Sequence, residues 1–289
     1  MEKIIFHSIN MQKLGQHFLQ NAAVLQKIVD ALILADGDRI IEIGPGHGEL
    51  TVPLLQAAHN KRCEIFCIEK DHALIEGMKR LASQENSADT GHINRVNIVE
   101  GDVLKLLTSL TSRDYKIVGN IPYYITGKLL RTISELEYKP KRVVLLIQKE
   151  VAERICAAPP AMNRLAASVQ FWADTTMLAT VPRKDFSPPP EVDSAVIVLD
   201  KKNSSPELLA QSIKDEPSLD PAQYYRAVRA IFAQPRKTLL NNLSEISGGI
   251  ATKNQLSAEL ESINIDPHVR PQNLSIAQIV SIAKSPLWG

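Results

Sequence analysis

Cysteine is scarce in this 289-residue sequence, which contains only Cys63, Cys67 and Cys156. Three cysteines are too few for a disulfide scaffold, and a C-x3-C pair without nearby partner ligands makes a poor zinc site. We therefore expect no metal site, and we expect Cys63 and Cys67 to alternate on a buried strand.

A strong excess of charge of one sign is also absent. Lys and Arg total 33 against 32 Asp and Glu, which gives a net charge of +1. This balance excludes a histone-like polycation, so any contact with nucleic acid must depend on local patches. With 44% hydrophobic and 22% charged residues, the composition also excludes wholesale disorder.

Long apolar runs are missing too. No stretch approaches the ~20 apolar residues of a membrane span, and the opening MEKIIFHSIN holds no apolar run of signal-peptide length. The sequence therefore predicts a cytoplasmic protein without a membrane partner.

The pattern that is present is an alternation of strand and helix. Short apolar runs typical of buried strands lie at 39–43, 63–68, 97–99, 115–118 and 142–147. Helical spacing over stretches such as 21–34 and 71–81 separates these runs. Strand followed by helix, repeated along the chain, predicts an α/β fold with a parallel sheet covered on both faces. Two further strand candidates, 176–181 and 192–199, bracket a Pro-rich stretch.

The last third of the chain has a different pattern. Residues 201–220 (KKNSSPELLAQSIKDEPSLD) are polar with two prolines and are interpreted as a linker. Only helical patterns follow, such as 224–232 and 276–283. We predict a catalytic domain over 1–200 and a small helical domain over 221–289.

Polar residues stand at the ends of four of the predicted strands. They are the glycine turn at 44–48 (GPGHG), Glu69, Asp102 and Asn120. Because ligands of parallel sheets bind beyond the carboxyl ends of the strands, these positions predict a binding site at that edge.

Each of the first three positions has a plainer interpretation as well. The glycines let the backbone approach a ligand closely, although G-x-G-x-G also suits a bare tight turn and is not the G-x-G-x-x-G of nicotinamide enzymes. Glu69 can accept both hydroxyls of a ribose, or it can be a solvated residue heading a helix. Asp102 can take the amino group of an adenine, or it can cap a helix over 103–107.

The most specific motif is Asn120-Ile121-Pro122-Tyr123. After a strand, the Asn120 amide oxygen and a main-chain carbonyl can both point into a cleft, and Pro122 holds Ile121 extended. Two acceptors beside an aromatic face suit a planar ring with an exocyclic amine, whose N–H groups they accept while Tyr123 stacks on the ring. An Asx-Pro turn without a ligand is the alternative.

With these motifs in place, the sequence resembles the ribosomal RNA adenine dimethyltransferase family. The family dimethylates N6 of two adjacent adenines near the 3′ end of small-subunit (16S) RNA. The matching segments run nearly end to end: Leu14–Leu19 (LGQHFL), Glu42–Thr51 (EIGPGHGELT), Glu69, Asp102, Asn120–Tyr123 (NIPY), Gln148–Arg154 (QKEVAER), Phe186–Val196 (FSPPPEVDSAV), Arg236–Leu239 (RKTL) and Arg270–Pro271.

The resemblance implies a fold, a cofactor and a partner. The fold would be a Rossmann-like methyltransferase sheet with a small helical C-terminal domain that contacts RNA. The cofactor would be S-adenosylmethionine, and the partner the small ribosomal subunit, approached by a cytoplasmic monomer that also serves subunit biogenesis.

The resemblance also assigns roles to individual residues. Glu69 would hold the cofactor's ribose and Asp102 its adenine amine. The other cofactor positions would be His17, Leu19, Gly44, Gly46 and Asn120. The target adenine would meet Asn120, Ile121, Pro122 and Tyr123, with Phe186 covering its other face unless Phe186 belongs to the core.

This sequence departs from the family pattern at three places. His17 stands where Asn is usual, 163–166 (NRLA) lacks the usual Tyr-Gly before Arg164 and Ser after Leu165, and Pro235 replaces the first Arg of a basic pair. The last change concerns contact with the RNA backbone rather than methyl transfer.

Three other functions compete with this one. A large-subunit (23S) RNA adenine methyltransferase of the antibiotic-resistance type shares the glycine turn and NIPY, but VDSA at 192–195 and QKEVAER favour the small-subunit group. A nicotinamide dehydrogenase leaves NIPY unexplained. A non-catalytic RNA-binding or transcription factor is disfavoured by the intact site.

Overall fold

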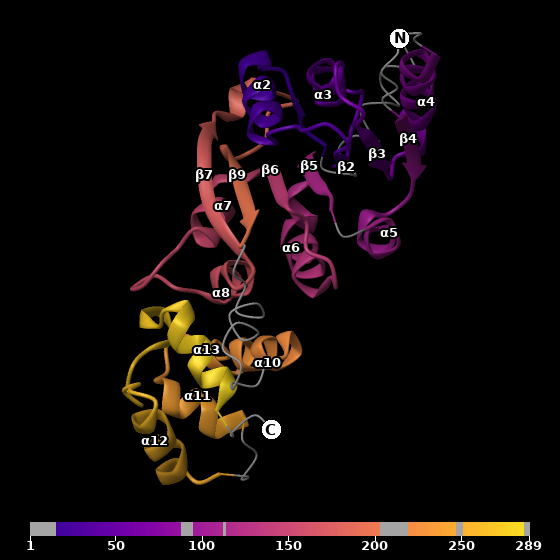
Figure 1. Cartoon of the computed structure of the whole chain (residues 1–289). Coiled ribbons are helices and arrows are strands. Elements are labelled where there is room, and N and C mark those ends of the chain that lie inside the picture. Colours follow the sequence, from indigo (N-terminus) through magenta and orange to yellow (C-terminus); the bar gives the residue numbers. More distant parts are fainter. Residues whose placement is uncertain (1–15, 88–94, 112–113, 203–218, 247–250, 286–289) are drawn as a thin grey trace. The chain divides into compact units, whose positions relative to one another are not determined.

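The computed structural model describes residues 16–87, 95–111, 114–202, 219–246 and 251–285. Leu14, Gly15 and most of the expected linker lie outside them. The chain divides into two compact units, Met1–Ala152 with Thr176–Asp200, and Glu153–Thr175 with Lys201–Gly289. Figure 1 labels the helices and strands of both units.

The first unit is built on a seven-stranded sheet with the order β4-β3-β2-β5-β6-β9-β7. The strands are β2 (Arg39–Ile43), β3 (Glu64–Glu69), β4 (Arg95–Glu100), β5 (Lys116–Asn120), β6 (Arg142–Gln148), β7 (Ala173–Val181) and β9 (Ser194–Lys201). The five strands from β4 to β6 are parallel, and β9 is antiparallel to β6. The predicted α/β parallel sheet is confirmed.

Helices cover both faces of this sheet (Figure 1). They are α2 (Ala22–Ala31), α3 (Thr51–Ala58), α4 (His72–Ser87), α5 (Val103–Leu110), α6 (Thr126–Glu135) and α7 (Lys149–Ile155), which runs into the second unit. Two short strands, β1 (Phe18–Leu19) and β8 (Phe186–Ser187), form a separate antiparallel pair. Sequence patterns alone did not predict α6, α7 or this pair.

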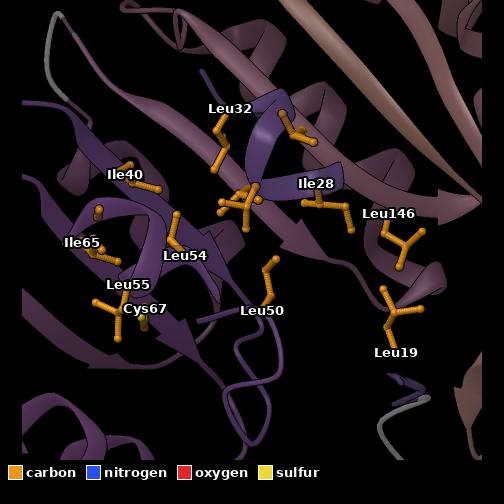
Figure 2. Close-up of a cluster of buried hydrophobic side chains, with 14 of the residues drawn as sticks. Leu19, Ile28, Leu32, Ile40, Leu50, Leu54, Leu55, Ile65, Cys67 and Leu146 are labelled. Carbon is orange, nitrogen blue, oxygen red and sulfur yellow. The ribbon is translucent and has the colours of Figure 1, made fainter. Parts of the chain in front are cut away.

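One hydrophobic core joins α2 and α3 to the sheet (Figure 2). Ile28 of α2, Leu54 of α3 and Ile65 of β3 are all fully buried. Burial of each such side chain contributes about 1.5–3 kcal/mol. Cys63 and Cys67 are buried in the same core and form no disulfide, as the sequence predicts.

Helix α2 ends earlier than its apolar pattern, which continues to Leu34. The helix stops at Ala31, and Ile33 adopts a positive φ of 47°. Leu32 is nevertheless fully buried, because the turn after the helix keeps it in the core. Apolar spacing therefore extends past the helix itself.

The second unit is helical. Its helices are α8 (Arg164–Gln170), α10 (Pro221–Ile231), α11 (Leu239–Ile246), α12 (Lys253–Ser262) and α13 (Ile276–Lys284). Its core includes Phe171, which stacks on Tyr224 with ring centroids 3.8 Å apart. Residues 153–175, which the sequence pattern places in the first domain, group with this unit because α8 buries Ala166 and Ala167 in its core.

Two of the departures from the family pattern lie in this unit. Asn163 caps α8, since its Oδ1 accepts hydrogen bonds from the amides of Leu165 and Ala166, both at 3.0 Å. Pro235 and Arg236 are exposed between α10 and α11. Neither departure disturbs the core of the unit.

Candidate active site

A cavity opens in the first unit at the carboxyl ends of β2, β3 and β5. It encloses about 620 Å³ of space, its open mouth included, and is called here the central cavity. Segments 16–19, 44–46 and 120–123 line it, together with Glu49 and Glu69. The parallel register, which pairs Ile43 with both Ile68 and Gly119, brings these strand ends together.

The glycine turn forms one wall of the central cavity. Gly44 and Gly46 have φ values of 66° and 64°, a region that side-chain-bearing residues rarely adopt. A Cβ on Gly46 would lie 2.8 Å from Cε1 of Phe18, so the backbone there runs directly against a ring. The turn leads toward α3 and lines the central cavity, so a ligand there could approach its backbone closely.

Glu69 is held rigidly at the end of β3. The amides of Lys70 and Asp71 each donate to its Oε1 at 2.8 Å, and the Gly46 amide donates to Oε2 at 3.3 Å. Burial raises the pKa of Glu69, since its exposure is 4%, and these three amides counteract part of the rise. Oε2, with its single long bond, is the oxygen best able to accept a ligand's hydroxyls.

Asp102 lines a second cavity, the Asp102 cavity, which measures about 400 Å³ with its open mouth included and shares Gly44, Glu69 and Pro122 with the first. Its Oδ1 caps α5 by accepting the Leu104 amide at 3.0 Å, and its Oδ2 pairs with Lys70 at 3.3 Å. Partial burial raises the pKa of Asp102, but the Leu104 amide and Lys70 together bring it below its ordinary value. Asp102 is thus a helix cap that also faces a cavity.

The Asn120 side chain has a defined orientation. Its Nδ2 donates to the main-chain carbonyl of His17 at 2.8 Å. This bond fixes the amide so that Oδ1 is the acceptor available to a ligand. Ile121 and Pro122 line the same cavity, and the Ile121 amide is bonded to the Leu146 carbonyl at 3.2 Å.

Tyr123 and His17 form an aromatic wall. Their ring centroids are 5.9 Å apart with an interplanar angle of 29°. The Tyr123 hydroxyl bonds to Ser194 Oγ at 2.7 Å, and His17 Nδ1 donates to the Pro188 carbonyl at 2.8 Å. Burial raises the pKa of Tyr123, so the phenol stays neutral near neutral pH.

Strand β1 of the β1–β8 pair forms part of the wall of the central cavity. Leu19 pairs in register with Phe186, and Leu19 lines the central cavity. Phe186 is 3% exposed, packs in the hydrophobic core and is not part of the cavity lining. Its role in covering a base stays a prediction that requires the ring to reach the cavity.

Sequence patterns did not single out Glu42 and Glu49, although both matter to the electrostatics of the site. Glu49 lines the central cavity and its Oε2 accepts the His47 amide at 3.0 Å. Glu42 is 1% exposed within β2. The sequence does contain one signal for Glu42: it is a carboxylate inside an apolar strand run, and a buried carboxylate usually has a partner.

Two kinds of feature are absent from the described residues. None of the described helices is both long and apolar enough to cross a membrane. The same residues contain no group of three His, Cys, Asp or Glu side chains placed to hold a metal ion.

Comparison with known sequences gives consistent matches. Residues 7–286 match the family model for ribosomal RNA adenine dimethylase. The chain is 34% identical to the ribosomal RNA small subunit methyltransferase A of Geobacillus kaustophilus, over 96% of this chain and 92% of that protein. It is 35% identical to the protein of the same name from Dehalococcoides mccartyi, over 92% and 84% respectively.

Solved structures agree in fold. A dimethyladenosine transferase from Plasmodium falciparum matches with a TM-score of 0.73 and 27% identity, over 92% of this chain and 96% of that one. The 23S rRNA methyltransferase ErmE matches with a TM-score of 0.66 at 21% identity, over 92% and 98%, which shows a shared fold alone. With the glycine turn, Glu69 and the NIPY segment gathered around one cavity, the chain belongs to the ribosomal RNA adenine dimethylase family.

Proposed function

We propose that this enzyme transfers methyl groups from S-adenosylmethionine to N6 of two adjacent adenines near the 3′ end of 16S ribosomal RNA. The curated relatives named above are small-subunit methyltransferases, and the matches extend over both units of the chain. The RNA is expected to be presented on a small-subunit particle in the cytoplasm, and the enzyme to act as a monomer.

The two cavities suit the proposed cofactor. The glycine turn and the rigid carboxylate of Glu69 border the space where a nucleoside with two ribose hydroxyls would fit, and Asp102 faces the adjoining cavity where a base amine would lie. His17, Leu19 and Asn120 line the remaining wall. When bound, the cofactor supplies a methyl group on a positively charged sulfur, which is a good leaving group.

The main task of the protein is to activate a weak nucleophile. The adenine N6 lone pair is delocalised into the ring, which makes the amine a poor nucleophile. Asn120 Oδ1 and the Ile121 carbonyl would accept its two N–H groups and favour a pyramidal nitrogen with a localised pair. Tyr123 would stack on the ring and hold the nitrogen in line with the methyl group.

Proton transfer follows rather than precedes methyl transfer. Once N6 has gained a methyl group it carries positive charge and loses a proton readily, so position counts more than a strong base. In the second round the amine has one N–H, so only one of the two acceptors remains engaged. The pocket must then also accommodate the first methyl group.

The orientation of Asn120 is the observation that carries this proposal. The bond from Nδ2 to the His17 carbonyl leaves Oδ1, and not the NH2 group, to meet a ligand. An acceptor at this position suits an exocyclic amine and does not suit a base edge that presents a carbonyl oxygen to it. This preference favours adenine N6 over the O6 edge of guanine.

The test is methyl transfer from radiolabelled S-adenosylmethionine to unmethylated small subunits, with unmethylated large-subunit RNA in parallel. Dimethyladenosine confined to the small-subunit RNA is expected. Labelling of the large-subunit RNA instead would move the assignment to the resistance-type methyltransferases. Cofactor binding without labelling of either RNA would indicate a binding protein that has lost its reaction.

A further inference from the structure

Glu49 directly follows the glycine turn and lines the central cavity. It stands two residues before α3, but α3 has no side-chain cap, so the carboxylate is not used at that helix end. The side chain turns back instead, and its Oε2 accepts the amide of His47 at 3.0 Å. Since an ionised carboxylate offers about four lone-pair sites, Glu49 can accept further donors from the cavity.

The backbone of Gly46 lies against two carboxylates, those of Glu49 and Glu69. A Cβ at Gly46 would lie 3.0 Å from Glu49 Oε2, and the Gly46 amide donates to Glu69 Oε2 at 3.3 Å. Both carboxylates line the central cavity, and no Lys or Arg occurs among the described residues of that lining. The cavity therefore favours a ligand that carries positive charge.

The two carboxylates differ in which cavity they reach. Glu69 lines both the central cavity and the Asp102 cavity, whereas Glu49 lines only the central one. A nucleoside whose ribose meets Glu69 and whose base meets Asp102 directs its 5′ substituent away from the base, into the part of the central cavity that Glu49 lines. In S-adenosylmethionine this substituent is an amino-acid chain that ends in an α-ammonium and an α-carboxylate group.

We propose that Glu49 binds the α-ammonium group of the cofactor's amino-acid chain. This inference rests on the proposed function. The ammonium group donates a charge-assisted hydrogen bond to the carboxylate, which is stronger than a bond between neutral groups. Glu69 then recognises the ribose and Glu49 the amino-acid chain. Because the cofactor and its product, S-adenosylhomocysteine, both carry the α-ammonium, Glu49 holds both compounds alike.

A purely structural role for Glu49 leads to different expectations. The bond from the His47 amide to Glu49 Oε2 also stiffens the turn, and loss of that bond would alter the affinity of every nucleoside that binds there. Loss of a bond to the α-ammonium would instead affect only ligands that carry this group. Glu49→Gln removes the charge and keeps a side-chain oxygen able to accept the His47 amide, so it separates the two roles.

Isothermal titration calorimetry of the whole protein with four ligands tests the proposal. S-adenosylmethionine and S-adenosylhomocysteine carry the α-ammonium, whereas deaminated S-adenosylhomocysteine and 5′-methylthioadenosine lack it. Wild type should bind S-adenosylhomocysteine about tenfold or more tightly than the deaminated compound. Glu49→Gln should weaken the binding of the first two ligands by about tenfold each and change the binding of the other two by about twofold or less.

The matched control is a glutamate of the same unit outside the cavity lining. Glu76 lies on α4 with its side chain 67% exposed, and its Oε1 pairs with Lys79 at 3.1 Å. Glu76→Gln should leave the affinities for all four ligands unchanged. Urea denaturation establishes that each variant is folded. If Glu49→Gln does not fold, Glu49→Ala is measured with the same four ligands, and the same selective loss is expected.

The outcomes separate this inference from the proposed function. Equal losses for all four ligands would show a structural role for Glu49, and a loss confined to S-adenosylmethionine would show that Glu49 responds to the sulfonium charge. Either result overturns the inference, as does unchanged binding of S-adenosylhomocysteine by the variant, and each leaves the proposed function intact. A wild type that binds none of the four ligands overturns the proposed function and this inference with it.

Discussion

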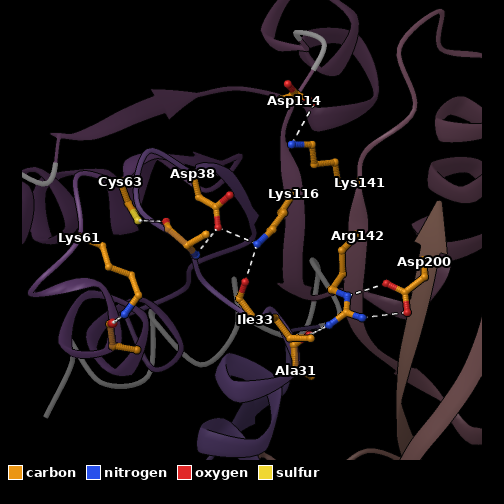
Figure 3. Close-up of polar contacts among 12 residues, drawn as sticks. Ala31, Ile33, Asp38, Lys61, Cys63, Asp114, Lys116, Lys141, Arg142 and Asp200 are labelled. Carbon is orange, nitrogen blue, oxygen red and sulfur yellow. Dashed lines mark hydrogen bonds and ion pairs between the residues drawn. The ribbon is translucent and has the colours of Figure 1, made fainter. Parts of the chain in front are cut away.

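The two ends of the central sheet treat charge in opposite ways. At the amino ends of the strands, Lys116 bonds to Asp38 at 2.6 Å and to the Ile33 carbonyl at 2.6 Å, and Arg142 forms two bonds to Asp200 (Figure 3). At the carboxyl ends, Glu69 is held by main-chain amides, and both Glu69 and Glu49 line the central cavity. The amino-end charges are thus neutralised by ion pairs, whereas the carboxylates of Glu49 and Glu69 at the carboxyl ends face a cavity without a Lys or Arg in its described lining. The contrast separates residues that hold the sheet together from residues proposed to bind a ligand.

The largest expected effect comes from breaking a pair at the amino ends. Lys116→Ala leaves Asp38 buried without its cation, because the two side chains are only 10% and 15% exposed. We expect the free energy of unfolding to fall by about 3–5 kcal/mol. Urea denaturation measures it. The matched control is Lys141→Ala, whose pair with Asp114 is 55% and 71% exposed and should contribute about 0.5 kcal/mol or less. Equal losses in the two variants would contradict the contrast.

The second largest effect is expected from removing Asn120 Oδ1, the acceptor at the carboxyl end of β5. Asn120→Ala should lower the single-turnover rate of methyl transfer about 100-fold or more and change cofactor affinity far less, because we propose that Oδ1, left available by the bond from Nδ2 to His17, accepts from the reacting amine. Asn163→Ala, which removes the cap of α8, should cost stability and leave the rate unchanged. Near-full turnover in Asn120→Ala would remove Asn120 from the mechanism.

A smaller effect concerns the pH dependence of stability. The pKa of Glu42 is about 7 in the folded protein against an ordinary value of 4.5. The folded state therefore binds the extra proton between these values, and stability falls as pH rises through this window, by up to about 3 kcal/mol. In unfolding measurements at pH 5 and pH 8, Glu42→Gln should show a smaller fall than the wild type. Identical pH dependence would mean that Glu42 titrates normally.

The smallest expected effect is a difference in stability between alanine substitutions at two glycines, Gly46 and Gly77. Gly46→Ala places a methyl group against Phe18 at a positive φ, which should cost about 1–2 kcal/mol of stability and weaken cofactor binding. Gly77 lies in α4 with open space around its Cα and an ordinary φ. Gly77→Ala should therefore raise the melting temperature slightly, since alanine favours the helix. A neutral Gly46→Ala would mean that the turn tolerates side chains.

Local sequence patterns predicted the sheet and the residues at its strand ends. Buried parallel strands appear as apolar runs, and whatever follows such a run must lie at the ligand-binding edge, which is how Glu69, Asp102 and Asn120 could be located. The boundary of α2 could not be predicted in the same way, because Leu32 stays apolar for the core after the helix has ended.

Contacts between distant segments could not be predicted. The bond from Asn120 to the His17 carbonyl spans 103 positions, and that from His17 to Pro188 spans 171. The burial of Phe186 and the contact of Glu42 with Cys67 likewise depend on which strands become neighbours. Periodicity describes one segment at a time, so it cannot reveal pairs of this kind.

The β1–β8 pair has a consequence for the growing chain. Phe18 and Leu19 pair with Ser187 and Phe186, and Tyr123 bonds to Ser194, so the walls of the cavity come from segments made at very different times during synthesis. A nascent chain that ends before residue 186 carries the glycine turn and Asn120 but lacks the strand that holds the His17 segment in place. The pocket is therefore completed late, and a truncated product of translation would not retain ribosomal RNA in a productive position.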